Sequence, residues 1–293
     1  MSALPAVELA RPTVQALLAT ARRRCADNSA AAGDCALLLA LALDAPRAWL
    51  LAHGEHRPDA AALGRFETLL QRRLAGEPMA YLRGRQGFWS LELDVTPDVL
   101  VPRPETELLV ELALACMGEC VSSQEGRLVD LGTGSGAIAL ALASARPHWQ
   151  IVATDRSAAA LAVAAGNAAR LGLSVEFRHG DWFAPLAGER FDIIVSNPPY
   201  IAAHDTCLEG DGVRREPRAA LVAGDEGLTD LGAIIAGSAA HLSPGGWLLL
   251  EHGADQGPAV RALLAASAFD AIATHADLAG RPRVTLGRLP CAN

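Results

Sequence analysis

The sequence contains no lysine, so all 25 of its basic residues are arginine. This absence excludes a lysine base or a lysine Schiff base. The six cysteines include no C-x-x-C pair, which argues against a zinc ribbon or a redox motif. No apolar run approaches the ~20 residues that span a bilayer, and the amino terminus lacks a signal-peptide charge pattern. We therefore expect a cytoplasmic protein with no membrane partner and no metal site.

Basic charge is also scarce in the larger part of the chain. Residues 1–85 hold 11 arginines and 8 acids, a net charge of +3, whereas residues 86–293 hold 14 arginines and 25 acids, a net charge of −11. Proteins that grip a nucleic-acid backbone usually carry a basic face over their active region. The charge balance therefore predicts no stable binding of nucleic acid.

Three regions of different pattern make up the 293 residues. Residues 1–76 are rich in alanine and leucine with helical spacing, which predicts a small helical domain. Residues 77–103 are expected to form a linker with a β-hairpin, because residues 88–95 alternate between apolar and polar as a strand does. The remaining residues, 104–293, are expected to form one larger domain.

Strands and helices alternate through this larger domain. Such alternation requires a mostly parallel, doubly wound sheet with helices on both faces. The fold class is therefore α/β, and the last two strands are expected to pair antiparallel. The seven predicted strands are residues 128–131, 151–154, 175–179, 191–195, 247–251, 271–275 and 284–287.

A glycine-rich loop follows the first predicted strand of the sheet and opens a helix. Glycines at this point permit a tight turn and a close approach of a ligand to backbone N–H groups. The pattern also satisfies G-x-G-x-x-G/A, so the loop alone leaves a dinucleotide fold open. The candidate cofactor-binding residues here are Asp130, Gly132, Thr133, Gly134, Ser135 and Gly136.

Acidic residues follow the next two strands. Asp155 lies about 20 residues after the loop, where a carboxylate accepts hydrogen bonds from ribose hydroxyls; its alternative role is to cap the following helix. Asp181 and Trp182 suit an adenine, with the acid accepting an amino hydrogen and the indole covering the ring. The alternative for Trp182 is to fill the edge of the sheet.

The acidic residue before the glycine loop distinguishes between the two possible cofactors, S-adenosylmethionine and a nicotinamide dinucleotide. Asp130 is placed to receive an ammonium group, directly or through water, whereas a dinucleotide would bring its pyrophosphate near the same carboxylate and be repelled. The electrostatics therefore favour S-adenosylmethionine over a nicotinamide dinucleotide.

Asn197-Pro198-Pro199-Tyr200 follows the strand at residues 191–195, where an open α/β sheet delivers residues to its ligand crevice. The asparagine offers a carbonyl acceptor, and the prolines leave the preceding carbonyls free. Tyr200 supplies a flat face for a planar amide or a base. The four residues predict a socket for a planar NH2 group; the alternative is a rigid turn after a strand.

Together these segments resemble the class I S-adenosylmethionine-dependent methyltransferases, which have a Rossmann-like fold. Four further segments narrow the resemblance over nearly the whole chain to the bacterial release factor glutamine methyltransferases, the PrmC/HemK family: residues 101–107 (VPRPETE), 180–183 (GDWF), 216–217 (EP) and 249–253 (LLEHG). The segment at residues 101–107 is the most specific of these, although as a sequence it equally fits the start of a helix.

The resemblance implies methyl transfer from S-adenosylmethionine to the side-chain amide nitrogen (N5) of the glutamine in the Gly-Gly-Gln motif of class 1 peptide release factors. It implies that the helical domain helps to hold this protein substrate. It assigns cofactor contacts to residues 132–136, Asp155 and Trp182, and substrate contacts to residues 197–200.

The expected mechanism depends mainly on positioning. The Asn197 side-chain carbonyl would accept one N–H of the substrate amide and the Pro198 backbone carbonyl the other, while Asn197 also borders the cofactor. The sequence is also compatible with two other functions. An amino-methyltransferase acting on adenine or guanine of nucleic acid would use the same four residues, and a noncatalytic cofactor-sensing protein would keep the same fold.

Overall fold

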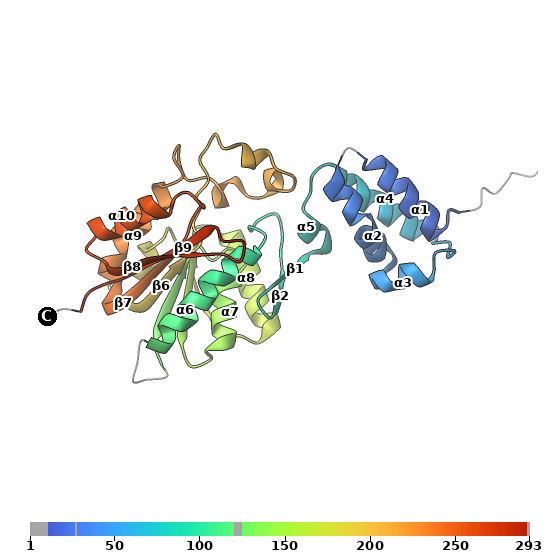
Figure 1. The fold of residues 1–293 in the computed structure, drawn as a ribbon. Helices are drawn as coiled ribbons and strands as arrows, with labels where there is room; N and C mark the ends of the chain where they lie inside the picture. Colours follow the sequence, from blue (N-terminus) through green and yellow to red (C-terminus); the bar gives the residue numbers. More distant parts are fainter. Residues whose placement is uncertain (1–10, 27, 120–124, 292–293) are drawn as a thin grey trace, which may run out of the picture. The chain divides into compact units, whose positions relative to one another are not determined.

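The computed structural model describes residues 11–26, 28–119 and 125–291. The chain forms two compact units (Figure 1). The first consists of residues 1–83 together with 211–215, and the second of residues 84–210 together with 216–293. The expected linker is therefore divided between the two units: residues 77–83 pack with the helices of the first, and the hairpin packs with the second.

Five helices form most of the first unit. Their apolar sides pack into one core that includes Val14, Leu38 and Leu70, each fully buried. Thr13, Asn28 and Asp59 each cap a helix through a side-chain oxygen, which satisfies an otherwise unpaired backbone N–H. The helices are α1 (Val14–Arg24), α2 (Ser29–Leu43), α3 (Arg47–Ala52), α4 (Ala60–Leu74) and α5 (Met79–Arg83).

A buried arginine ties the separate segment 211–215 to this unit. The Arg73 residue is 4% exposed. Its guanidinium donates to Asp34 at 2.8 Å and forms two hydrogen bonds with Asp211, one of them 3.0 Å long. These two carboxylates hold the pKa of Arg73 above its usual value. The first unit is thus completed by residues that lie far along the sequence.

The second unit begins with a two-stranded hairpin, β1 (Arg85–Phe88) and β2 (Leu91–Asp94). The expected hairpin thus lies within residues 77–103, and the alternating segment 88–95 holds its turn and the whole of β2. Trp89 has a φ of 55°, in the left-handed region that ends a strand. Its N–H is held by the Glu107 carboxylate at 2.8 Å. A contact 18 residues away therefore stabilises a turn that the alternating pattern conceals.

The seven-stranded, mostly parallel sheet is confirmed. Its strand order is β5-β4-β3-β6-β7-β9-β8, and only the pairs that involve β9 are antiparallel, which also confirms the antiparallel pairing of the last two strands. The strands are β3 (Arg127–Leu131), β4 (Gln150–Asp155), β5 (Glu176–His179), β6 (Phe191–Ser196), β7 (Leu242–Glu251), β8 (Asp270–Ala276) and β9 (Pro282–Arg288).

Helices cover both faces of this sheet, and the alternation of side chains along each strand supplies two apolar cores. Along β7, Leu249 joins the core that includes α6 and α7, whereas Leu248 and Leu250 join the core that includes α9 and α10. The helices of this unit are α6 (Glu107–Glu119), α7 (Ala137–Ala145), α8 (Ala158–Leu171), α9 (Thr229–His241) and α10 (Gly257–Ala266). None of the helices in the described ranges is long and apolar enough to cross a membrane.

The parallel strand order brings the carboxyl ends of β3, β4, β5 and β6 to one edge of the sheet. The glycine loop, Asp155, Asp181 and Asn197 follow these four strands in turn. Residues that are spread along the sequence from Gly132 to Asn197 are therefore gathered along one edge, as the ligand crevice of an open α/β sheet requires.

Candidate active site

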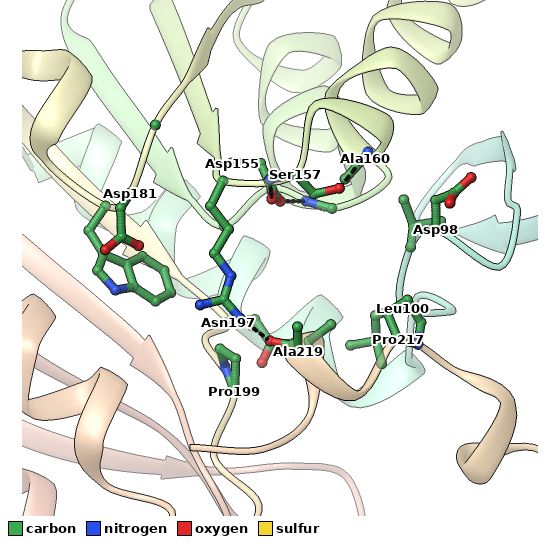
Figure 2. Close-up of a pocket in the computed structure, with 17 residues that line it drawn as sticks. Asp98, Leu100, Asp155, Ser157, Ala160, Asp181, Asn197, Pro199, Pro217 and Ala219 are labelled. Carbon is green, nitrogen blue, oxygen red and sulfur yellow. Dashed lines mark hydrogen bonds between the residues drawn. The ribbon is translucent and has the colours of Figure 1, made fainter. Parts of the chain in front are cut away.

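A cavity lies along this edge of the second unit and encloses about 780 Å³, including its opening to solvent. Figure 2 shows the labelled side chains arranged around it. Seven of the sequence-predicted residues line it: Gly132, Gly134, Asp155, Asp181, Trp182, Asn197 and Pro199.

The glycine loop forms the floor of the cavity. Gly132, Gly134 and Gly136 have φ values of 74°, 56° and 85°, which only glycine adopts without strain. A Cβ on Gly132 would lie 3.2 Å from the Trp182 ring, so the absence of a side chain lets the indole lie against the loop. Thr133 is buried in the loop instead of facing the cavity. Ser135 is buried in the same way.

Asp130, at the end of β3, is fully buried beneath this loop. Its Oδ2 accepts the Thr133 hydroxyl at 2.7 Å and the Ala139 N–H at 3.3 Å. Its Oδ1 has no hydrogen-bond partner among the described residues. Burial raises the pKa of this carboxyl to about 7. A buried carboxylate with a spare oxygen is the group that a positively charged ligand atom, or a water it binds, would satisfy.

Asp155 lies at the wall of the cavity, at the end of β4. Its two oxygens accept the Gly134 N–H at 2.9 Å and the Ser157 N–H at 2.8 Å. The cap of α8 is Ser157, whose hydroxyl accepts the Ala160 N–H at 3.1 Å. Asp155 is therefore held rigidly by the loop and the turn before α8, with further lone pairs available to hydroxyl groups in the cavity.

Asp181 and Trp182 form the side of the cavity that follows β5. Trp182 has a φ of 42°, an unusual conformation for a residue with a large side chain. Its carbonyl accepts the Thr154 hydroxyl at 3.4 Å. Strain of this kind persists where surrounding structure enforces it and is concentrated at functional sites. The indole lies where it can cover a flat ring.

The four residues after β6 are divided between the cavity and its support. Asn197 and Pro199 line the cavity. Pro198 is buried, and the hydroxyl of Tyr200 donates to the buried carboxylate of Glu251 at 3.4 Å. The Asn197 amide donates through Nδ2 to the Thr106 hydroxyl at 3.1 Å. The amide is thus anchored by its nitrogen, and Oδ1 is the end that remains for a ligand.

The segment at residues 101–107 supports the cavity without lining it. The carboxylate of Glu216, on a residue that is 6% exposed, pairs with the Arg103 guanidinium and accepts the Val101 N–H at 3.0 Å. This pair fixes the chain just before Pro217, which lines the cavity. Pro104 opens the 3-10 helix η1 (Pro104–Thr106), which leads into α6.

Several residues that line the cavity are not predicted by the sequence. Arg156 lines the cavity, and its guanidinium donates to the Ala219 carbonyl at 3.1 Å. Apolar and small residues complete the wall, and no local pattern distinguishes them from ordinary packing. The additional lining residues are Asp98, Val99, Leu100, Arg156, Ser157, Ala160, Gly180, Pro217, Ala219 and Ala220. Among the described residues, no group of three or more His, Cys, Asp or Glu side chains is arranged to hold a metal ion.

Comparison with protein families matches both units of the chain. Residues 16–84 match the family described as the PrmC N-terminal domain, and residues 106–210 match the methyltransferase small domain.

Relatives of similar length match almost the whole chain. The sequence is 52% identical over 280 residues to the release factor glutamine methyltransferase of Xylella fastidiosa strain Temecula1, covering 95% of this chain and 99% of the relative. It is 50% identical over 266 residues to that of Pseudomonas aeruginosa, covering 90% and 95%. It is 46% identical over 280 residues to that of Vibrio cholerae, covering 94% and 96%.

Solved structures of other methyltransferases share the fold. The catalytic domain of hMettl16, solved in complex with MAT2A 3′UTR hairpin 6, matches with a TM-score of 0.54 at 18% identity, covering 80% of this chain and 83% of that one. The Thermus thermophilus 16S rRNA N2 G1207 methyltransferase, solved with AdoMet and guanosine, matches with a TM-score of 0.51 at 24% identity, covering 70% and 49%.

Proposed function

Because the chain belongs to the family of release factor glutamine methyltransferases, we propose that it transfers a methyl group from S-adenosylmethionine to the side-chain amide nitrogen of the glutamine in the Gly-Gly-Gln motif of class 1 release factors. The observation that carries the proposal is that Asn197 lines the same cavity as Gly132 and Asp155. An acceptor for an amide N–H and a cradle for a nucleoside therefore open into one space.

The residues of the cavity fit this cofactor. Asp155 would accept the ribose hydroxyls, and Asp181 and Trp182 would hold the adenine. The spare oxygen of Asp130, buried beneath the glycine loop, would balance the ammonium of the methionine portion, directly or through water. A pyrophosphate in its place would be repelled by the same carboxylate. We therefore assign Asp130, residues 132–136, Asp155, Asp181, Trp182 and Asn197 to cofactor binding.

The chain's own residues would act by positioning. The bound cofactor supplies a methyl carbon made electrophilic by a positively charged sulfur. Asn197 Oδ1 would accept one N–H of the substrate amide, and the Pro198 backbone carbonyl would accept the other. Both dipoles would stabilise the positive charge that grows on the nitrogen as its bond to carbon forms. The released proton leaves to water, so no lysine or histidine base is needed.

Pro199 and Tyr200 would complete the substrate socket. The first lines the cavity, and the second is fixed through its hydroxyl to Glu251. For the first unit we propose a role in recognising the release factor, and we place its functional boundary at residue 76 with a linker over residues 77–103. We further propose that the enzyme works in the cytoplasm, without stable binding to nucleic acid or to a membrane.

Methylation of adenine or guanine in nucleic acid is the weaker alternative. Such enzymes extrude a base and hold the phosphates beside it. Residues 86–293 carry a net charge of −11, which opposes phosphate binding. DNA binding that survives moderate salt would favour this alternative.

A methyl-transfer assay tests the proposal directly. The full chain, labelled S-adenosylmethionine and a purified class 1 release factor are mixed, and the label on the release factor is counted. We expect label on the wild-type release factor and none on a variant with Gln→Ala in its Gly-Gly-Gln motif. Equal labelling of the two substrates would refute the assigned target.

The Asp130 carboxyl should make cofactor affinity depend on pH. Because its pKa is raised to about 7 without a ligand, the carboxyl is mostly protonated at pH 5.5 and mostly ionised above 7. An ammonium, which keeps its proton up to a pKa of about 8, favours the ionised form. Affinity measured by calorimetry should therefore rise with pH from 5.5 to 7, by up to about tenfold per unit.

Asp130→Asn provides the matched variant, because it keeps the shape of the side chain and removes the charge. Its affinity should be lower at pH 7 and nearly independent of pH over the same range. A wild-type affinity that does not change with pH would contradict pairing of Asp130 with the ammonium.

A further inference from the structure

The orientation of the Asn197 carboxamide depends on one buried hydroxyl. Nδ2 of Asn197 donates to Oγ1 of Thr106 at 3.1 Å, and Thr106 is 4% exposed. A hydroxyl has one hydrogen to donate and lone pairs that accept. If its hydrogen pointed at Asn197, the amide would have to turn over and present Oδ1 to Thr106. The amide keeps its orientation only when the hydroxyl hydrogen is drawn elsewhere.

Glu251 is a buried carboxyl group on the strand next to Asn197. It ends β7, which pairs with β6 directly before Asn197, and it is 1% exposed. Its Oε1 accepts the Tyr200 hydroxyl at 3.4 Å, and its Oε2 has no hydrogen-bond partner among the described residues, so the carboxylate has an acceptor to spare. Donation from the Thr106 hydroxyl would oppose the rise that burial causes in the pKa of this carboxyl.

We propose that Glu251 is a positioning residue: its carboxylate draws the Thr106 hydroxyl hydrogen, which forces Thr106 to accept from Asn197 and keeps Asn197 Oδ1 facing the substrate amide. The same carboxylate holds Tyr200, so one buried charge fixes both ends of the four-residue segment after β6. This inference rests on the proposed function for the identity of the substrate, but the orientation of Asn197 is a property of the chain alone.

Because the role of Glu251 requires an ionised carboxylate, the proposal predicts that kcat depends on pH. Burial is the largest cause that raises its pKa, to about 7, and the neighbouring Glu105 on η1 also raises it. Donation from Thr106 and Tyr200 and the charge of Arg283 on β9 lower it. Below pH 7 the protonated carboxyl itself donates a hydrogen, and the direction of donation through Thr106 is no longer fixed. At saturating cofactor, kcat should therefore fall as the pH drops below about 7.

Variants at residues 106 and 251 test the proposal. Thr106→Val, nearly the same shape without the hydroxyl, should lower kcat about 10- to 100-fold, the range expected for a misplaced reacting group. Thr106→Ser should restore most of the activity because it returns the hydroxyl. Glu251→Gln should also lower kcat and should remove its fall below pH 7. Cofactor affinity by calorimetry should stay within about twofold in all three variants, since none of these side chains lines the cavity.

Thr285→Val is the matched control. Thr285 is a fully buried threonine of β9 that hydrogen-bonds to His252 and Thr274 and not to Asn197. The Thr285→Val variant should be less stable but should keep kcat within about twofold of the wild type, because loss of this hydroxyl leaves the reacting groups in place. If Thr106→Val matched this control in kcat, or if Thr106→Ser failed to restore activity, the positioning role would be overturned.

A measurement on the cofactor-free protein separates this inference from the proposed function. The ¹⁵N side-chain NH2 signal of Asn197 should move in Thr106→Val and return in Thr106→Ser. An unmoved signal would overturn the inference even in an active enzyme. A moved signal in a protein that fails to methylate release factors would instead overturn the assigned substrate and support the orientation of Asn197.

Discussion

Replacement of Asn197 by alanine is expected to lower kcat about 10³-fold while cofactor affinity changes by less than about threefold. The side chain removed is the acceptor aimed at the substrate N–H, and its effect is greatest when positive charge develops on the nitrogen. Asp155, Asp181 and Trp182, which would hold the nucleoside, remain in place. The loss should therefore appear in the chemical step and not in cofactor binding.

Single-turnover kinetics on a release factor, with calorimetry of S-adenosylmethionine on the same preparation, measures both quantities. Equal losses of kcat and of cofactor affinity would show that Asn197 supports the cavity as a whole. The melting temperature of the variant provides the control for folding, because Thr106 loses only one neutral hydrogen bond.

Gly227→Ala is expected to disturb the same segment from outside the cavity. Gly227 has a φ of 71°, and an added Cβ would lie 2.3 Å from the Tyr200 carbonyl oxygen and 2.8 Å from Gln256 Nε2. Gln256 itself donates to the Tyr200 carbonyl at 2.9 Å. The backbone directly after the two prolines would have to move, which would displace Asn197. We expect a loss of about 3 kcal/mol in the free energy of unfolding and at least about 100-fold in kcat.

Gly280→Ala is the matched control for this variant. Gly280 has a φ of 76°, but a Cβ there meets no atom within 4 Å. Gly280→Ala should therefore lower the free energy of unfolding by only about 1 kcal/mol, the cost of the left-handed conformation for alanine. The kcat of this variant should match that of the wild type. Urea unfolding and kcat of the two variants give the comparison. Similar behaviour of the two glycines would show that the segment after β6 tolerates displacement.

The sequence predicts the sheet well because buried parallel strands appear as short apolar runs bounded by turn residues, a local signal that does not depend on distant contacts. Pairs between distant residues leave no such signal. Glu216 and Arg103 are 113 residues apart, and neither has a local pattern that identifies its partner. The position of the turn at Trp89 likewise depends on a distant contact, since Glu107 holds it from another element.

In the candidate site, too, the residues with a local signal were predicted and those that depend on distant contacts were not. Polar residues after strands were predicted as a group because the carboxyl ends of parallel strands meet at one edge, and Asp155, Asp181 and Asn197 do line one cavity. Thr106 was passed over, because a threonine in the first turn of a helix is ordinary. Its significance comes only from the partners that the fold brings to it.

Arg73 and Asp211 are separated by 138 positions, although both belong to the first unit. During synthesis, the helices of this unit leave the ribosome long before the acid that completes the pairing of the buried guanidinium. Until then Arg73 has only Asp34 as an ionic partner within the unit. The pairing of Arg73 is therefore completed only after the first four strands of the large sheet, and the residues that follow them, have been made.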